Sequence, residues 1–110
     1  MINRIFKNVC VTGAGSGIGR AIAIAMSNEG YNVTCADINL KQANETLEII
    51  LKRNGSGISI KTDVTKINDI ENMVLKTVKQ FGTIDILVNN AGVTRTCLLY
   101  TSDAADDAWC

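Results

Sequence analysis

The chain has 110 residues, of which 46% are hydrophobic and 20% charged, as is ordinary for a single globular domain and unlike a disordered chain. Eleven basic and eleven acidic residues balance, so the composition offers no basic surface for nucleic acid or an anionic membrane. No apolar run reaches the roughly 18 residues of a membrane span, and the start lacks the apolar core of a signal peptide. We therefore expect a cytoplasmic protein.

Strand-like and helix-like segments alternate along the chain. We expect strands at 8–12, 31–37, 58–63 and 84–88, because these runs are short and apolar or β-branched. Helices are expected from 17 to 29, from a cap at Asn39 to Asn54-Gly55, and from a cap at Thr65 to Phe81-Gly82. Their expected buried stripes are Leu40, Ala43, Leu47, Ile50 and Leu51 in the second helix, and Ile67, Ile70, Met73, Val74, Thr77 and Val78 in the third.

This alternation predicts the fold class. It is an α/β, Rossmann-type, doubly wound parallel sheet in the order β-α-β-α-β-α-β, truncated after the fourth strand. Ligands of such sheets bind past the carboxyl ends of the strands, where the strand order reverses.

A glycine-rich loop follows the first strand, with the sequence Thr12-Gly13-Ala14-Gly15-Ser16-Gly17-Ile18-Gly19. Strand, loop and helix together can place a phosphate on a helix N-terminus. No lysine follows a glycine, which excludes a P-loop, and Ile18 stands where the Gly-x-Gly-x-x-Gly fingerprint needs its third glycine. The alternative is a glycine-rich turn that serves packing alone.

Three further segments follow the other expected strands: Asp37, Asp63-Val64 and Asn89–Gly92. Their convergence on one sheet edge predicts a nicotinamide-nucleotide site. The Asp37 carboxylate can accept hydrogen bonds from ribose hydroxyls and repel a 2′-phosphate, which favours NAD over NADP. Asp37 and Asp63 could instead be helix-capping or turn aspartates. Arg20 and Lys41 are the nearby basic residues and leave a mixed NAD/NADP preference open.

The pattern Thr12-Gly13-x-x-x-Gly17-x-Gly19, together with Asn89-Asn90-Ala91-Gly92, resembles the short-chain dehydrogenase/reductase family, classical type. The resemblance implies that Asp63 meets the adenine amine, that the backbone at Val64 meets a ring nitrogen, and that Asn90 braces the sheet. Thr12 would tie the two signature loops together. The implied cofactor-binding residues are Thr12, Gly13, Gly15, Ser16, Gly17, Ile18, Gly19, Asp37, Asp63, Val64, Asn90, Ala91 and Gly92.

The continuation to Arg95 further resembles 3-oxoacyl-acyl-carrier-protein reductases, although that subgroup usually prefers NADP and Asp37 disagrees. The family's catalytic Ser and Tyr-x-x-x-Lys are not found: Tyr31 is followed four residues later by Cys35, and Tyr100 by Ala104. The resemblance implies an alcohol/ketone oxidoreductase that forms a homo-oligomer, dimer or tetramer, with this chain as the N-terminal cofactor-binding half, inactive alone. The alternatives are a catalytically dead NAD-binding sensor or scaffold, or a non-functional truncated product.

We expect residues 1–95 to be the N-terminal part of a dinucleotide-binding domain, and residues 96–110 to be an anomalous tail. The run 97–107 resembles a translated sequencing-adapter read-through, with a native divergent loop as the alternative. With no histidine and no Cys-x-x-Cys, neither a metal site nor a Ser-His triad is expected. Cys10 and Cys35 are expected to be buried and reduced.

Overall fold

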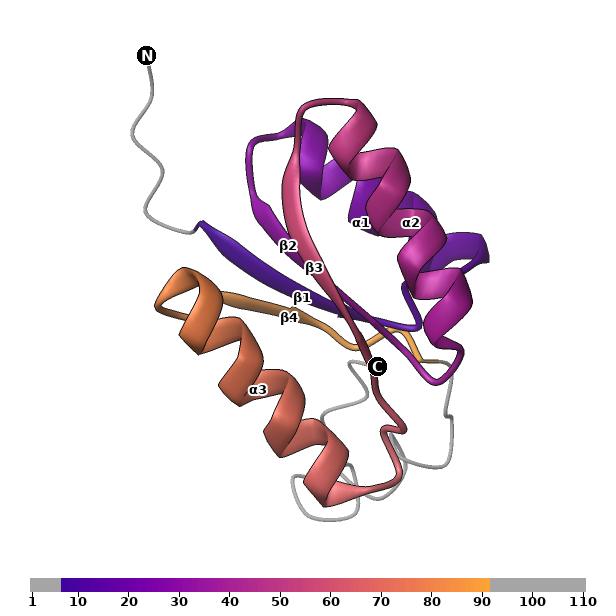
Figure 1. Ribbon diagram of the computed structural model, residues 1–110, viewed down its shortest axis with the longest axis vertical. Helices are drawn as coiled ribbons and strands as arrows, with labels where there is room; N and C mark the ends of the chain where they lie inside the picture. The colour runs from indigo at the N-terminus through magenta and orange to yellow at the C-terminus, as the bar shows by residue number, and fades with distance from the viewer. Residues whose placement is uncertain (1–6, 92–110) are drawn as a thin grey trace, which may run out of the picture.

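The computed structural model describes residues 7–91. Within them one parallel sheet has the strand order β3-β2-β1-β4. Its strands are β1 (Asn8–Thr12), β2 (Asn32–Asp37), β3 (Ser56–Lys61) and β4 (Ile86–Val88). The connecting helices are α1 (Gly17–Asn28), α2 (Leu40–Lys52) and α3 (Ile67–Phe81) (Figure 1). The expected order of elements and the parallel sheet are confirmed.

The helices form two layers around the sheet, with α1 and α2 on one face and α3 on the other (Figure 1). The strand order explains this division. The chain steps from β1 through β2 to β3, then returns past β1 to β4, and crossovers of one hand place helices on opposite faces when the direction reverses. The reversal between β1 and β4 is the point where open α/β sheets bind ligands.

Two apolar clusters, one on each face of the sheet, pack the helices against it. The larger cluster joins the sheet to α1 and α2, and its fully buried members are Val9, Val11, Ala14, Ala23, Val33, Cys35, Ala43 and Ile50. The smaller cluster lies under α3 and consists of Cys10, Ala36 and Met73 with partly buried isoleucines around it. Alternate residues of β1 and β2 thus serve opposite faces, as the two-residue period of a strand requires.

Three strands differ from expectation in their bounds. β2 begins at Asn32 rather than at residue 31. β3 begins at Ser56, two residues early, and ends at Lys61 rather than at residue 63. Its first residues are Ser56 and Gly57, which carry no strand pattern, yet they pair with Asn32 and Val33 of β2. β4 begins at Ile86 rather than at residue 84.

The helix ends are mostly as expected. Gly30, just past α1, has a φ of 95°, a left-handed conformation that glycine commonly adopts after the last turn of a helix. The Asn39 side chain caps α2 by accepting a hydrogen bond from the Gln42 backbone N at 3.1 Å. The expected Thr65 cap of α3 is wrong, because the N-cap position belongs to Lys66 and the Thr65 hydroxyl donates to Asp63 instead.

The buried stripes of α2 and α3 are narrower than the sequence pattern suggests. Leu40 and Leu51 are exposed at the ends of α2, and Ile67, Val74 and Val78 are exposed on α3. Thr77 of α3 is fully buried, as expected, and Thr46 of α2, which lies outside the expected stripe, is fully buried as well. Each buried hydroxyl is hydrogen-bonded, which removes the cost of placing it there.

Candidate dinucleotide site

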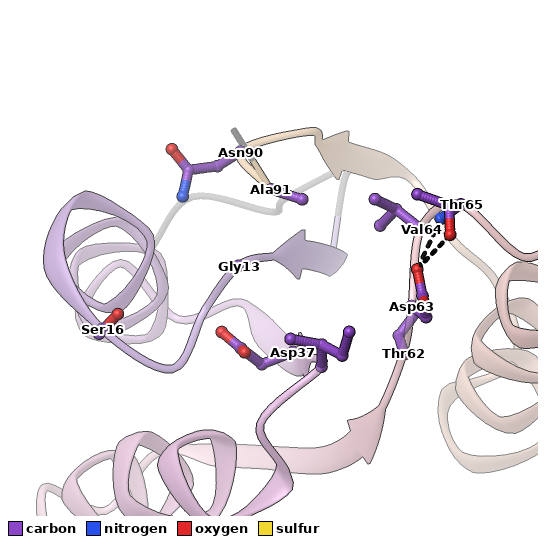
Figure 2. Close-up of a pocket in the computed structure, with 10 residues that line it drawn as sticks. Gly13, Ser16, Asp37, Thr62, Asp63, Val64, Thr65, Asn90 and Ala91 are labelled. Carbon is purple, nitrogen blue, oxygen red and sulfur yellow. Dashed lines mark hydrogen bonds between the residues drawn. The ribbon is translucent and has the colours of Figure 1, made fainter. Parts of the chain in front are cut away.

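A cavity of about 420 Å³ lies at the carboxyl ends of the strands (Figure 2). Its size is within the range of small-molecule sites. Seven predicted site residues line it: Gly13, Ser16, Asp37, Asp63, Val64, Asn90 and Ala91. The lining also includes Ile38, Thr62 and Thr65, which sequence reasoning missed although each is adjacent to a predicted residue. The other predicted residues among those described do not line the cavity; they are Thr12, Gly15, Gly17, Ile18 and Gly19.

The glycine loop is shaped by close backbone contacts. Gly13 has a φ of 65°, and a Cβ there would lie 2.9 Å from the Asn90 carbonyl O. A Cβ on Gly19 would lie 1.9 Å from the Gly13 carbonyl O. These two positions therefore require glycine, because any side chain would push the loop away from β4 or from α1.

The loop delivers the N-terminus of α1 to the cavity edge. Ser16 occupies the N-cap position but makes no side-chain cap hydrogen bond, and the first turn of α1 contains no acidic residue. Ile18 is 72% exposed, and a Cβ on Gly17 would meet nothing within 4 Å. The first-turn backbone N–H groups of a helix have no partner within the helix and carry the positive end of its dipole, an arrangement suited to an anion.

Asp37, the last residue of β2, is held between the glycine loop and α2. Its Oδ2 accepts a hydrogen bond from the Gly15 backbone N at 2.8 Å, and its Oδ1 accepts one from the Asn39 backbone N at 2.9 Å. A carboxylate oxygen can accept more than one hydrogen bond, so both atoms keep capacity for a ligand hydroxyl. Figure 2 places the Asp37 side chain between Ser16 and Asp63 at the cavity.

Asp63 follows β3 and lines the same cavity as Asp37, with its carboxylate pointing to Thr65 and with Val64 nearby (Figure 2). Its Oδ1 accepts hydrogen bonds from the Thr65 hydroxyl at 2.6 Å and from the Thr65 backbone N at 2.9 Å. These bonds, with the nearby Lys66 and Lys61, lower the pKa of the Asp63 carboxyl. Asp63 is therefore an ionised acceptor at neutral pH.

Thr12 joins the two signature loops. Its hydroxyl O accepts hydrogen bonds from the backbone N atoms of Asn90 at 3.0 Å and Ala91 at 3.1 Å, and donates toward Asn89 Oδ1 at 3.3 Å. At 3% exposed, Thr12 does not line the cavity. Its geometry matches the loop-tying role, and it sets the position of the Asn90-Ala91 backbone.

The two basic residues noted near Asp37 do not line the cavity. The Arg20 side chain turns to α2, where its Nη2 lies 3.1 Å from Glu45 Oε1. Lys41 is exposed. Ile38 is also exposed, at 60%, and adds an apolar side chain next to Asp37 in the lining.

Residues 7–91 hold no cluster of three or more side chains able to ligate a metal. In the same residues, no helix has the length and apolar character needed to cross a bilayer. The predicted site residue Gly92 and the predicted tail 96–110 lie outside the described part of the chain.

Comparisons with known proteins agree with this geometry. The family model for short chain dehydrogenases matches residues 7–109. A 3-oxoacyl-acyl-carrier-protein reductase of Staphylococcus epidermidis is 40% identical over 94 residues, which are 84% of this chain and 38% of the relative. An uncharacterized oxidoreductase of Thermotoga maritima is 46% identical over 87 residues, 79% of this chain and 34% of that protein.

Solved structures give the same result. A hydroxysteroid dehydrogenase from Escherichia coli is similar with a TM-score of 0.77 and 36% identity over 78% of this chain and 37% of that one. A 7α-hydroxysteroid dehydrogenase complexed with NADH and 7-oxo glycochenodeoxycholic acid has a TM-score of 0.76 and 34% identity, over 82% of this chain and 37% of that one. The chain thus spans about two fifths of the length of the relatives it matches. It belongs to the short-chain dehydrogenase family of oxidoreductases.

Proposed function

We propose that this chain binds NAD and forms the cofactor-binding part of an oxidoreductase that transfers hydride between an alcohol and a ketone. The observation that carries the proposal is the position of Asp37, whose carboxylate lines the cavity within reach of the glycine loop. In this role residues 1–95 belong to a dinucleotide-binding domain. The protein containing it would act on a small-molecule carbonyl or alcohol, as a cytoplasmic homo-oligomer without nucleic-acid or membrane partners.

The residues around the cavity suit the separate parts of a dinucleotide. Gly13, Gly15, Ser16, Gly17, Ile18 and Gly19 would place the diphosphate on the N-terminus of α1. Asp37 would accept hydrogen bonds from the adenosine ribose hydroxyls, and Asp63 one from the adenine amine. Ile38 and Val64 would supply apolar contact to the adenine ring. Thr12, Asn90, Ala91 and Gly92 would shape the wall toward the second ribose.

The bound nicotinamide would supply the hydride acceptor or donor. The chain's own contribution is binding and orientation, because its two tyrosines lack the lysine four residues later that the family's catalytic pair requires. A catalytically dead NAD-binding sensor would share this site, and the presence of Tyr-x-x-x-Lys in the protein that contains this chain separates the two. The run 97–107 resembles adapter sequence, and resequencing the encoding DNA with different adapters tests whether the tail 96–110 is native.

The preference for NAD follows from charge. Asp37 would repel a 2′-phosphate, and Arg20, which could bind one, is engaged by α2. Isothermal titration of the chain should give an affinity for NAD+ about tenfold or more above that for NADP+. Asp37→Asn should weaken NAD+ binding and lower the ratio of NAD+ affinity to NADP+ affinity. Glu71→Gln, which removes an equal charge at an exposed position of α3, should leave this ratio unchanged. Equal binding of both cofactors by the unaltered chain would refute the assignment.

A further inference from the structure

Two hydrogen bonds run from Arg20 of α1 through Thr46 of α2 to Ala14 of the glycine loop, and this pair of bonds is called the relay below. The relay lies outside the cavity. Arg20 Nε donates a hydrogen bond to the Thr46 hydroxyl O at 2.9 Å. The Thr46 hydroxyl in turn lies 2.7 Å from the carbonyl O of Ala14, the second residue of the loop turn. Thr46 and Ala14 are both fully buried, and none of the three residues lines the cavity.

The arrangement fixes the direction of the single Thr46 hydroxyl proton. A helical threonine commonly donates back to the carbonyl four residues earlier, and here that atom, Gln42 O, lies 3.3 Å away. Arg20 Nη2 also donates to Gln42 O, at 3.3 Å, while Arg20 Nε fills the acceptor side of the hydroxyl. The Thr46 hydroxyl therefore donates its hydrogen bond to Ala14 O, the nearer of the two carbonyl oxygens. The charged Arg20 guanidinium, which donates to the same hydroxyl, strengthens that bond.

The loop turn is thus held from two sides. On the sheet side, the Ala14 backbone N donates to Ala36 O of β2 at 3.0 Å. On the helix side, Ala14 O accepts a hydrogen bond from the Thr46 hydroxyl. The next residue, Gly15, donates to Asp37, and a Cβ on Gly15 would lie 2.7 Å from Gln42 Cβ, so the turn packs directly against α2.

We propose that Thr46 and Arg20 are positioning residues for the diphosphate of the cofactor. They act through Ala14 O and set the loop backbone between β1 and α1, without touching the ligand. This inference rests on the proposed function for its ligand. It assigns Arg20 to the loop rather than to a cofactor phosphate.

The test uses Thr46→Val, which keeps the shape of the side chain and removes the hydroxyl. In the 110-residue chain, affinity for ADP-ribose should fall about tenfold, since a buried carbonyl loses its partner and the loop shifts. Affinity for adenosine, which has no diphosphate, should change less than twofold by NMR titration. Thr46→Ser should restore ADP-ribose binding.

Thr77→Val is the matched control. Thr77 is equally buried in a helix and also bonds the carbonyl four residues earlier, but it faces Cys10 and Thr34 under α3. The Thr77→Val variant should leave the ratio of ADP-ribose affinity to adenosine affinity unchanged. If Thr46→Val and Thr77→Val lower both affinities alike, Thr46 is only structural and the proposal is wrong.

Arg20→Met provides a second variant, because the Arg20 side chain is 29% exposed and its loss should be tolerated by the fold. Without ligand, both Arg20→Met and Thr46→Val should speed hydrogen exchange at the Gly15 amide. A loss of ADP-ribose affinity in Arg20→Met with unchanged Gly15 exchange would mean a direct phosphate contact and overturn the relay. If the unaltered chain binds neither ligand, the proposed function fails, while the exchange measurement still decides the relay.

Discussion

Asp37 Oδ2 accepts a hydrogen bond from the backbone N of Gly15 at 2.8 Å, which links the end of β2 to the loop after β1. Asp37, which is expected to bind the adenosine ribose hydroxyls, therefore also supports the glycine loop, which is expected to hold the diphosphate. A Cβ on Gly15 would stand 2.8 Å from the same oxygen, so the contact depends on glycine. The other carboxylate oxygen, Asp37 Oδ1, is held independently of the loop by the backbone N of Asn39 at 2.9 Å.

Glycine substitutions in the loop should separate steric from conformational effects. In Gly19→Ala the new Cβ would lie 1.9 Å from Gly13 O and 2.6 Å from Asn90 Nδ2, so the loop must move. We expect loss of ADP-ribose binding and a lower Tm. In Gly17→Ala the Cβ has free space and the cost is the φ of 55°, roughly 1–2 kcal/mol of stability. Thermal melts and titrations of both variants check this, and a milder phenotype for Gly19→Ala would contradict it.

Asp85 should make stability depend on pH. Its Oδ2 accepts hydrogen bonds from the backbone N atoms of Lys7 and Asn8, both at 3.0 Å, and from the Thr83 hydroxyl at 3.2 Å. These bonds lower the pKa of Asp85 in the folded state. The folded state therefore binds this proton less readily than the unfolded state. The stabilisation is present above the unfolded pKa, near 3.9, and is lost as pH falls through the folded value.

Urea unfolding of the chain and of Asp85→Asn at several pH values measures this contribution. The variant should be less stable at pH 7, and the difference should shrink below about pH 4. A difference that is the same at pH 7 and pH 3 would show that the charge of Asp85 does not matter.

The two cysteines of the sheet should be unreactive until the chain unfolds. Burial raises the pKa of the Cys35 thiol to about 12, and it also raises the pKa of Cys10. Since the thiolate is the nucleophile, iodoacetamide at pH 8 should label neither site in the folded chain. Mass spectrometry of peptides should find both labelled in denaturant. Rapid labelling of Cys35 without denaturant would mean that β2 is not packed as described.

Leu87 should influence solubility more than stability. It is the central residue of β4 and 57% exposed, whereas its neighbours Ile86 and Val88 pack against the larger cluster. An exposed apolar strand at a sheet edge promotes association. Leu87→Thr should therefore reduce light scattering with little change in Tm, and Val88→Thr should lower Tm. If both variants change Tm equally, Leu87 is buried in solution.

Much of the fold could be predicted because strand and helix periods alternate and the glycines stand at the turns. The start of β3 could not be predicted because Ser56 and Gly57 carry no hydrophobic signal and join the strand only by pairing with β2. The stripes of α2 and α3 were partly wrong because several apolar residues of the pattern, such as Val74 and Val78, are exposed in the fold. Hydrophobicity also cannot reveal a buried threonine that finds hydrogen-bond partners in the fold. For the same reason Thr46 escaped notice, although it holds Ala14.

The candidate site was predictable to the extent that strand ends meet at one edge. Asp37, Asp63 and Asn90 lie far apart in sequence and line one cavity because parallel strands bring them there. The orientation of Arg20 could not be predicted, since an arginine at that position could equally face a ligand phosphate. Its contacts with Glu45 and Thr46 depend on how α2 packs against α1.

The most direct test of the account is a titration of the ¹⁵N-labelled chain with NAD+, followed by the backbone amide shifts. Saturable shifts are expected at Gly13–Gly19, Asp37, Asp63, Val64, Asn90 and Ala91, and none at the opposite end of the sheet around Asp85. Saturable binding whose shifts fall around Asp85 or along α3, or no binding at all, would contradict it.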